Sequence, residues 1–322
     1  MQAPAWSEDR EFDVLVVGDL NIDLILSGVP KLPEYGEEVL ATGVAQRLGG
    51  SAANFAVCCA RLGRRVGFVA NVGRDEFGDF LIAELERAGV STEFIGRHES
   101  LATGITVSLS GAQDRAFVTY VGTIDSLYGE AVPRELLARA RHLHIASYFL
   151  QTRLQPGALG LVQAARAAGL SISLDTGYDP AEQWNHGLLE LISEVDIVLP
   201  NEMEAVAISG AGSAEAALAV LCAMVETAVV KIGAEGSMAC EGAQTVHIPA
   251  FSIGTADTTG CGDAFNAGFI DATLAGRPLP DALARGNACG ALMASVVGAD
   301  AAIITEPAVA GILCGTCTTE TP

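Results

Sequence analysis

Residues 257–265 read Asp-Thr-Thr-Gly-Cys-Gly-Asp-Ala-Phe and lead into an apolar stretch that we expect to be a helix. Gly260 and Gly262 flank the small Cys261, so the backbone N–H groups at the start of this helix should be accessible. Free N–H groups and the helix dipole together bind anions. Asp263 lies in the same turn, where it could take a proton from a hydroxyl group while the amides hold an anionic group. Alternatively, Asp263 only complements the helix dipole and the glycines only form a tight turn.

Several other nucleotide-binding and nucleophile motifs are missing from the sequence. A P-loop requires Gly-Lys-Ser/Thr, but the chain's two lysines, Lys31 and Lys231, are not preceded by glycine. A dinucleotide-binding fold requires G-x-G-x-x-G after its first strand, whereas Gly18 is followed by Asp-Leu-Asn-Ile. There is also no G-x-S-x-G nucleophile elbow. These three site types are therefore excluded.

A second set of polar side chains lies near the start of the chain. Residues 12–18 form a β-branched apolar run, which predicts a buried strand. Polar and apolar residues then alternate from Asp19 to Leu24, so Asp19, Asn21 and Asp23 share one face of a strand. This face either binds a ligand or is the exposed face of an ordinary edge strand.

Strands and helices alternate along most of the chain, which predicts an α/β fold with a parallel sheet covered on both faces. A helix is expected at 51–62. Later strands are expected at 142–146, 171–175, 196–199 and 228–232. The first three are followed by helices expected at 156–168, 185–192 and 202–208, respectively. No internal repeat or long linker is present, so we predict a single domain spanning 1–322, with a flexible tail at 314–322.

Two segments interrupt the alternation of strands and helices. Residues 37–47 and 103–121 are predicted to form β-hairpins, the second turning near 111–114. Together they could form a small separate sheet, and we expect a lid built from roughly 19–48 and 101–125. The alternative is a decorated edge of the main sheet.

The composition indicates a globular, acidic protein. Half of the 322 residues are hydrophobic, which is enough for a large core, and the formal net charge is −21. Nucleic acids and anionic membranes bind basic surfaces, so neither is expected as a partner. The first residues lack the apolar run of a signal peptide, and we expect a cytoplasmic protein.

The chain contains eight cysteines. Without a secretion signal we expect them to be reduced thiols, several of them in the core. Cys314 and Cys317 form a C-x-x-C pair in the terminal tail, but a structural zinc site needs about four ligands and there is no second pair.

Two segments resemble the signatures of the ribokinase family, the PfkB-type carbohydrate kinases that include ribokinases, fructokinases and adenosine kinases. Residues 257–265 resemble the C-terminal signature. Residues 49–54 (Gly-Gly-Ser-Ala-Ala-Asn), followed by 60–63 and 71–75, resemble the N-terminal one. The similarity extends over residues 12 to 305 in the family's order. It implies a three-layer α/β/α fold with a mostly parallel sheet and a small β-sheet lid, and a kinase that uses ATP and Mg²⁺.

The resemblance also implies roles for individual residues. Asp263 would be the catalytic base that activates the acceptor hydroxyl, and the amides of Gly260, Cys261 and Gly262 would form the anion hole. Five residues would line the acceptor pocket: Asn21, Asp23, Gly49, Gly50 and Asn54. Asp257 would help to bind a monovalent cation such as K⁺, together with carbonyl groups near Gly298.

Two further segments would bind the nucleotide. Asn201 and Glu204 resemble an N-x-x-E element that organises Mg²⁺ and phosphates through water. The same spacing is also that of a helix capping box, and both roles can hold together. Lys231, Gly233 and Gly236 resemble a nucleotide-binding turn after a strand, where the lysine either approaches a phosphate or only extends into water.

The sequence departs from its relatives at positions that affect the substrate. Ser51 replaces the lysine of ribokinase-like members, and residues 122–125 (Gly-Thr-Ile-Asp) replace a common Gly-Ala-Asn. No cluster of basic residues suggests a phosphorylated acceptor, so we expect transfer to the primary hydroxyl of an unphosphorylated sugar. The alternatives are a nucleoside kinase, with a base stacked on Tyr148 or Phe149, and a non-catalytic sugar sensor. A homodimer could form through the lid.

Overall fold

The computed structural model describes residues 10–111 and 115–315. Its main sheet has ten strands in the order β14-β13-β12-β11-β10-β9-β1-β4-β5, with β6 also pairing with β4. Its strands are β1 (Phe12–Val17), β4 (Val66–Gly73), β5 (Val90–Ser91), β6 (Ile95–His98), β9 (Ala140–Ile145), β10 (Ser171–Leu174), β11 (Ile197–Val198), β12 (Thr227–Lys231), β13 (Ser237–Glu241) and β14 (Gln244–Ile248). All neighbours pair in parallel except β13 and β14, which form an antiparallel edge.

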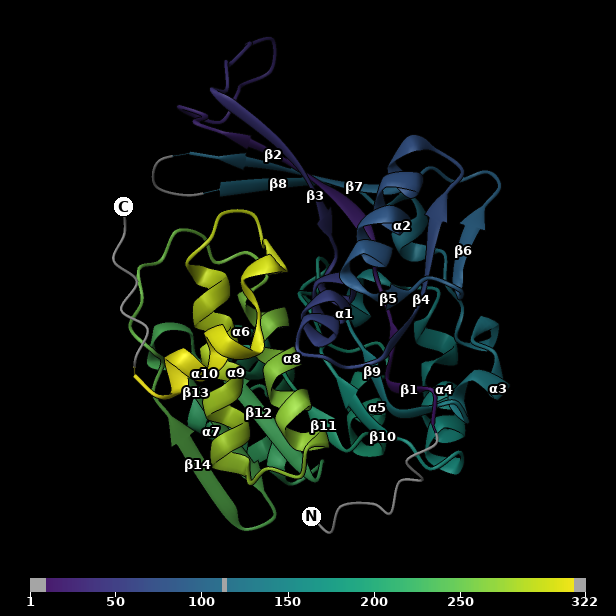
Figure 1. Ribbon diagram of the computed structural model, residues 1–322, viewed down its shortest axis with the longest axis vertical. Coiled ribbons are helices and arrows are strands. Elements are labelled where there is room, and N and C mark those ends of the chain that lie inside the picture. Colours follow the sequence, from purple (N-terminus) through teal and green to yellow (C-terminus); the bar gives the residue numbers. More distant parts are fainter. Residues whose placement is uncertain (1–9, 112–114, 316–322) are drawn as a thin grey trace.

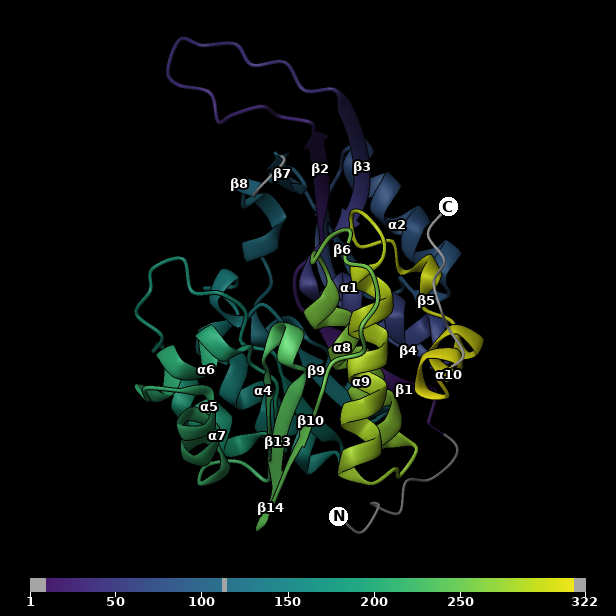
Figure 2. The same ribbon diagram turned by 90° about the vertical axis from the view of Figure 1, so that its left-hand side faces the viewer.

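Helices cover both faces of this sheet, as Figures 1 and 2 show. One face carries α1 (Ser51–Arg61), α2 (Glu76–Ala88), α8 (Cys261–Leu274), α9 (Leu279–Ala294) and α10 (Glu306–Leu313). The other carries α3 (Arg134–Leu137), α4 (Gln155–Ala167), α5 (Leu188–Glu194), α6 (Glu202–Ser209) and α7 (Ala214–Cys222). Each layer buries its own apolar cluster, and every residue of β1 is buried because the sheet is covered on both sides. The predicted three-layer α/β/α fold is confirmed.

A second, four-stranded sheet has the order β3-β2-β7-β8. It consists of β2 (Asn21–Ser27), β3 (Gly43–Gly49), β7 (Gly104–Ser110) and β8 (Arg115–Tyr120). The predicted hairpin at 103–121 matches β7 and β8, although part of its turn lies outside the described residues. The hairpin predicted at 37–47 is wrong. Residues 37–42 form no strand, and β3 pairs instead with β2, which precedes a long projecting loop (Figure 2).

Two of the cysteines are disulfide-bonded, contrary to the expectation of reduced thiols throughout. Cys222 at the end of α7 is joined to Cys240 on β13, with their Cα atoms 6.1 Å apart. The tertiary packing of α7 on β13 brings the two together, and their separation of 18 residues gave no hint of it. Cys314 is a free thiol, and Cys317 lies outside the described residues.

Within residues 10–111 and 115–315, no single helix is long and apolar enough to cross a membrane. The bent pair α6 and α7 reaches the length and hydropathy of a membrane span only when its two helices are taken together.

Candidate active site

Polar residues follow the carboxyl ends of five neighbouring parallel strands of the main sheet. Asp19 comes after β1, Ser147 after β9, Asp175 after β10 and Asn201 after β11, while Lys231 ends β12. In open α/β sheets this edge is the usual place for ligands. The start of α8 lies at the same edge, so the structure gathers the chemistry-bearing residues on one side of the molecule (Figure 1).

The start of α8 carries the predicted base. Asp263 is 9% exposed, and its Oδ2 accepts a hydrogen bond of 3.0 Å from Nδ2 of Asn54 on α1. Gly260 is the N-cap of α8 in a left-handed conformation (φ 73°), where a Cβ would lie 2.8 Å from that of Ala299. Glycine is therefore required at this turn, and the first amides of α8 are left beside Asp263.

The environment of Asp263 favours its protonated form. The pKa of Asp263 is raised to about 8, chiefly by burial and next by the nearby carboxylate of Asp175. The hydrogen bond from Asn54 and the charge of Lys231 act in the opposite direction. A carboxyl group with a pKa near the working pH can both accept and return a proton, which is what a general base needs.

The residues predicted for the acceptor pocket lie together on β2 and where β3 leads into α1. Asn21 Nδ2 donates to Asp23 Oδ1 at 2.9 Å and to Thr106 Oγ1 on β7 at 3.4 Å. Asp23 packs over Gly49, where a Cβ would lie only 2.2 Å from Asp23 Oδ1. Burial raises the pKa of Asp23 to about 7, against the hydrogen bond from Asn21. This arrangement offers carboxyl, amide and hydroxyl groups, which suit a polyhydroxylated ligand.

Asp19 links this pocket to helix α1. Its carboxylate accepts hydrogen bonds from the backbone N–H groups of Ser51 (3.1 Å) and Ala52 (2.9 Å), and so caps the start of the helix. At Gly50, φ is 101° and a Cβ would lie 2.7 Å from the Asp19 carbonyl oxygen. The Gly-Gly pair is therefore needed to bring the chain between Asp19 and Asp23.

Asn201 and Glu204 form a capping box at the start of α6. Asn201 Oδ1 accepts the Glu204 N–H at 2.9 Å, and Glu204 Oε2 accepts the Asn201 N–H at 2.9 Å. The capping interpretation of this spacing is confirmed. Glu204 is nevertheless buried beside Asp175, and both effects raise its pKa. Asn201 and Glu204 can therefore cap α6 and still bind a metal ion or a phosphate group.

The three residues of the expected nucleotide-binding turn lie in two different environments. Gly233 begins a short 3₁₀ turn between β12 and β13, and Gly236 ends it. Lys231 does not extend into water: its side chain is 13% exposed, and its ammonium group is paired with Asp175. The lysine therefore faces the start of α8, while the two glycines shape the turn that follows.

Asp257 anchors two backbone segments near α8. Its Oδ1 accepts the Thr259 N–H at 2.9 Å, and its Oδ2 accepts the Gly298 N–H at 2.9 Å. The structure thus brings Asp257 and the Gly298 loop together, and the cation-binding role that the resemblance implied stays a prediction. Within the described residues, no group of three or more His, Cys, Asp or Glu side chains could hold a metal ion.

Two residues of this region were not assigned a role from the sequence: Asp175 and Asn266. Asn266 lies one turn after Asp263, and that spacing was the available signal. Asp175 directly follows β10, where a polar residue at the carboxyl end of a parallel strand also indicates a site.

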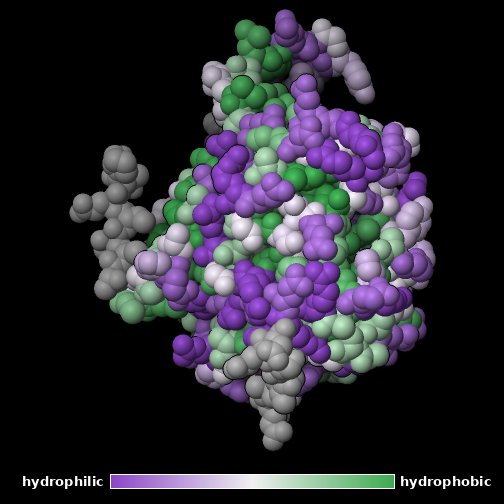
Figure 3. All heavy atoms as spheres, turned by 45° about the vertical axis from the view of Figure 1, so that its right-hand side comes forward, coloured by the Kyte–Doolittle hydropathy of each residue, from purple (hydrophilic) through white to green (hydrophobic). Residues whose placement is uncertain are grey.

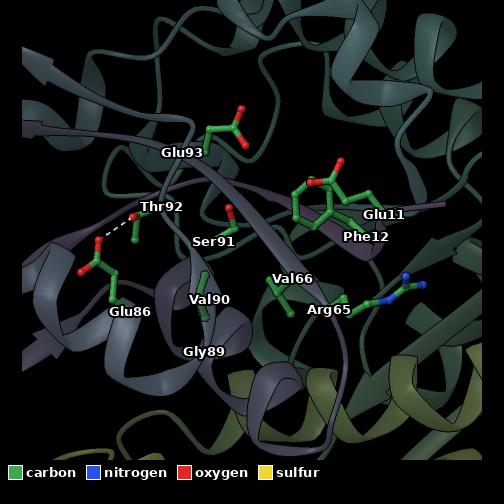
Figure 4. A pocket seen from close by; sticks show the side chains of 10 residues that line it. All are labelled: Glu11, Phe12, Arg65, Val66, Glu86, Gly89, Val90, Ser91, Thr92 and Glu93. Carbon is green, nitrogen blue, oxygen red and sulfur yellow. Dashed lines mark hydrogen bonds between the residues drawn. The ribbon is translucent and has the colours of Figure 1, made fainter.

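An open cavity of about 540 Å³ lies away from this site (Figure 4). It borders the amino ends of β1 and β4, at the opposite edge of the sheet from Asp263. Its charged side chains are engaged with protein partners, including Glu11 with Arg139 and Arg65 with Asp13. Its position and its pairing give no support for a catalytic role.

Comparisons with known proteins agree with this geometry. Residues 11–306 match the pfkB family of carbohydrate kinases. Ribokinase from Haemophilus influenzae is 30% identical over 298 residues, covering 90% of this chain and 95% of that protein. ATP-dependent ribose-1-phosphate kinase from Halopiger xanaduensis is 30% identical over 308 residues, covering 93% and 97%.

Solved structures share the fold. Arabidopsis thaliana ribokinase complexed with ribose and ATP superimposes with a TM-score of 0.81 at 24% identity, covering 94% of this chain and 98% of that one. A structure from E. coli, described as a Ribokinase II in complex with ATP and Mg²⁺, has a TM-score of 0.85 at 23% identity, covering 94% and 99%. The chain therefore belongs to the pfkB family of carbohydrate kinases and is a phosphotransferase that acts on a sugar hydroxyl group.

Proposed function

We propose that the protein transfers the γ-phosphoryl group of Mg-ATP to a hydroxymethyl group of an unphosphorylated sugar. The observation that carries this proposal is the hydrogen bond from Asn54 to Asp263, 3.0 Å long. It joins the polar pocket of β2 and α1 to the anion-binding start of α8. A sugar hydroxyl held by that pocket would lie next to a base and next to the first amides of α8.

The named residues divide the reaction between them. Asp263 takes the proton of the acceptor hydroxyl, and the amides of Gly260, Cys261 and Gly262 stabilise the charge of the transferred group. Asn21, Asp23 and Asn54 orient the sugar, because catalysis of phosphoryl transfer is mostly positioning and charge stabilisation.

The cofactors fit the donor groups available. Mg²⁺ prefers oxygen ligands and keeps several waters, which suits the Glu204 carboxylate and Asn201 at the start of α6. When bound, the ion neutralises charge on the ATP phosphates. Nucleotide phosphates would also approach Lys231, and the turn with Gly233 and Gly236 would border the nucleotide. We further propose a K⁺ site at Asp257, tested by comparing turnover in K⁺ and Na⁺ buffers.

The chemical class of the acceptor substrate should be measured directly. The β2 pocket offers neutral and acidic groups, which favours a free sugar. Arg47, paired in register with Asp23 across β2 and β3, favours a sugar phosphate as the second candidate. ADP release from Mg-ATP should be measured against free sugars, sugar phosphates and nucleosides. A free sugar standing far above the ATP-only rate supports the proposal, and a sugar phosphate doing so overturns the choice of acceptor.

The other two alternatives receive less support. Tyr148 is 1% exposed and Phe149 4%, and both pack in the apolar cluster of the α3–α7 layer. Neither ring offers a face on which a nucleoside base could stack. A non-catalytic sensor would need neither a buried base at Asp263 nor the glycines beside it.

Alanine at Gly49 should damage acceptor binding. The added Cβ would lie 2.2 Å from Asp23 Oδ1 and would push that carboxyl group out of place. We expect kcat/KM for the sugar to fall by on the order of 10²-fold, with KM for ATP nearly unchanged. Gly160→Ala is the matched control, because a Cβ there meets no atom within 4 Å. Unchanged sugar kinetics in Gly49→Ala would contradict the placement of Asp23 in the pocket.

We propose that the second sheet is the lid of the site and also a dimer interface. Its pocket face carries Asn21 and Asp23, and Ile25 on that face approaches the Gly298 loop. The opposite face is apolar by strand alternation, and we call it the outer face: Leu24, Leu26, Val44, Val107, Leu109, Val118 and Tyr120. Val44 is 70% exposed and Val118 62%. Figure 3 shows hydrophilic and hydrophobic side chains mixed over one face, with both kinds also exposed where the chain projects at the top.

A second copy of the chain is the proposed partner of the outer face, because a two-fold axis pairs one apolar patch with itself. Sedimentation at micromolar concentration should give a dimer. Val44→Glu combined with Val118→Glu should shift it to monomer, since both side chains become charged within the interface. Val220→Glu, on exposed α7, is the matched control and should remain dimeric. A monomeric wild-type protein would overturn the interface.

A further inference from the structure

Lys231 occupies an unusual place for a lysine. It is one of two lysines in a chain with a net charge of −21, and its side chain is only 13% exposed. Its Nζ donates to Asp175 Oδ2 at 3.1 Å and to Asn266 Oδ1 at 3.2 Å. Asn266 Nδ2 in turn donates to the same Asp175 oxygen. Lys231 at the end of β12, Asp175 directly after β10 and Asn266 on α8 thus form a closed, buried group.

This group lies directly against the predicted anion hole. A Cβ built on Gly262 would meet Lys231 Nζ at 3.4 Å, closer than any other atom. Gly262 follows Cys261 in the first turn of α8, beside Asp263. The ammonium group is therefore next to the amides proposed to hold the transferred phosphoryl group.

The hydrogen-bond count of Lys231 points to a ligand. An ammonium group has three N–H donors. Across the described residues, two of them have acceptors, Asp175 and Asn266. A donor thus remains for a group bound at Gly262.

The charges of the surroundings keep the lysine ionised. Burial acts to lower the pKa of Lys231, but Asp175 and then Glu204 raise it above its ordinary value. Burial acts to raise the pKa of Asp175, and Lys231 lowers it below its ordinary value. A buried ion pair of this kind is weak evidence for a purely stabilising role, because desolvation offsets much of the attraction.

Resting on the proposed kinase function, we propose that Lys231 is a catalytic residue that donates its third N–H to an oxygen of the transferred phosphoryl group. Asp175 and Asn266 are positioning residues that fix its ammonium group beside Gly262. In a loose transition state, negative charge spreads over the equatorial phosphoryl oxygens. A fixed cation beside the amides stabilises that charge without rearranging. The asparagine amide can serve both neighbours in one orientation only, with oxygen toward Lys231 and nitrogen toward Asp175.

The first test needs no knowledge of the acceptor. Binding of Mg-ADP and of the non-hydrolysable triphosphate Mg-AMP-PNP should be measured by calorimetry for wild type and Lys231→Met. We expect the variant to lose on the order of 10-fold in AMP-PNP affinity and to keep ADP affinity within about threefold, because a charge-assisted hydrogen bond to the terminal phosphate is lost. Equal affinities of the variant and the wild type for both nucleotides overturn the role of Lys231 while leaving the kinase proposal standing. A wild type that binds neither nucleotide overturns both.

The second test separates a catalytic from a structural role. With an active acceptor, Lys231→Met should lower kcat by on the order of 10²-fold or more. Asp175→Asn should lower both kcat and Tm, since it leaves a buried ammonium group without its anion. The double variant Asp175→Asn/Lys231→Met should recover Tm but not kcat. Arg87→Met removes a cation on α2 whose side chain is 63% exposed, and serves as the control with unchanged kinetics. Recovery of kcat together with Tm in the double variant would show that the group is only structural.

Discussion

Replacing Asp263 with asparagine is expected to lower kcat by on the order of 10²–10⁴-fold, because the variant can no longer take the acceptor proton. Asparagine has nearly the same shape, and its side-chain oxygen can still accept the hydrogen bond from Asn54. ATP and sugar binding should therefore change little. The measurement is steady-state ADP release with the best acceptor, together with KM for both substrates. Turnover within a few-fold of wild type would remove Asp263 from the role of base.

The same substitution should stabilise the protein at alkaline pH. Burial raises the pKa of Asp263 to about 8 in the folded chain, compared with about 3.9 for an unfolded aspartate. Between these values the folded state holds a proton that the unfolded state has released. Stability from this group is thus fully present below pH 4 and is lost as the pH rises to about 8, by at most ~1.4 kcal/mol per pH unit. Asparagine has no such dependence.

Thermal unfolding measured from pH 4 to pH 8 checks whether the stability contributed by Asp263 falls as the pH rises. The Tm advantage of Asp263→Asn over wild type should grow from pH 4 to pH 8 and then level off. In the wild type, kcat/KM for the sugar should be half-maximal at about pH 8 and reach its plateau about one pH unit higher, because the free enzyme needs the ionised carboxylate. Asp79→Asn, on the exposed part of α2, is the control for general charge effects. A Tm advantage that shrinks toward pH 8 would contradict the buried, protonated state of Asp263.

Replacing Asp271 with alanine is expected to destabilise the fold by about 3–5 kcal/mol, because it leaves two arginines without their shared anion. Asp271 on α8 accepts from Arg64 Nε at 2.5 Å and from Arg285 Nε at 2.6 Å. The side chain of Asp271 is 7% exposed, that of Arg64 20% and that of Arg285 14%. The group joins the end of α1 to α8 and α9. The expected fall in Tm is on the order of 10 °C, measured by calorimetry or circular dichroism.

Glu306 provides the matched control for this prediction. It pairs with Arg285 Nη2 at 2.5 Å, but its side chain is 62% exposed. Glu306→Gln should therefore change the free energy of unfolding by less than about 1 kcal/mol. Similar effects of the two substitutions would mean that burial of the Asp271 group contributes nothing beyond a surface ion pair.

The local pattern of the sequence was sufficient for several elements. The apolar run at 12–18 predicted β1, and the alternation after it predicted the polar face of β2 with Asn21 and Asp23. The Gly-Cys-Gly-Asp segment predicted the start of α8. These features depend on residues that are close in the chain, so periodicity and turn chemistry are enough to locate them.

Strand pairing could not be obtained in the same way. The hairpin predicted at 37–47 failed because β3 pairs with β2 across the loop at 28–42. Alternation indicates which residues share a face but does not name the partner strand. The partner is chosen by the register that places Ile22 beside Leu48 and Ile105, because these three side chains can then pack against the core.

The sequence by itself determined the alternation of strands and helices over much of the chain, the polar strand face and the start of α8. Only the tertiary structure decided that Asn54 meets Asp263 and that Lys231 faces Gly262 instead of solvent. Asn54 and Asp263 are 209 positions apart in the chain. Such contacts are set by how helices pack on a sheet, where the carboxyl ends of distant strands meet at one edge. That edge does not exist until the sheet has formed, so no local pattern can specify it.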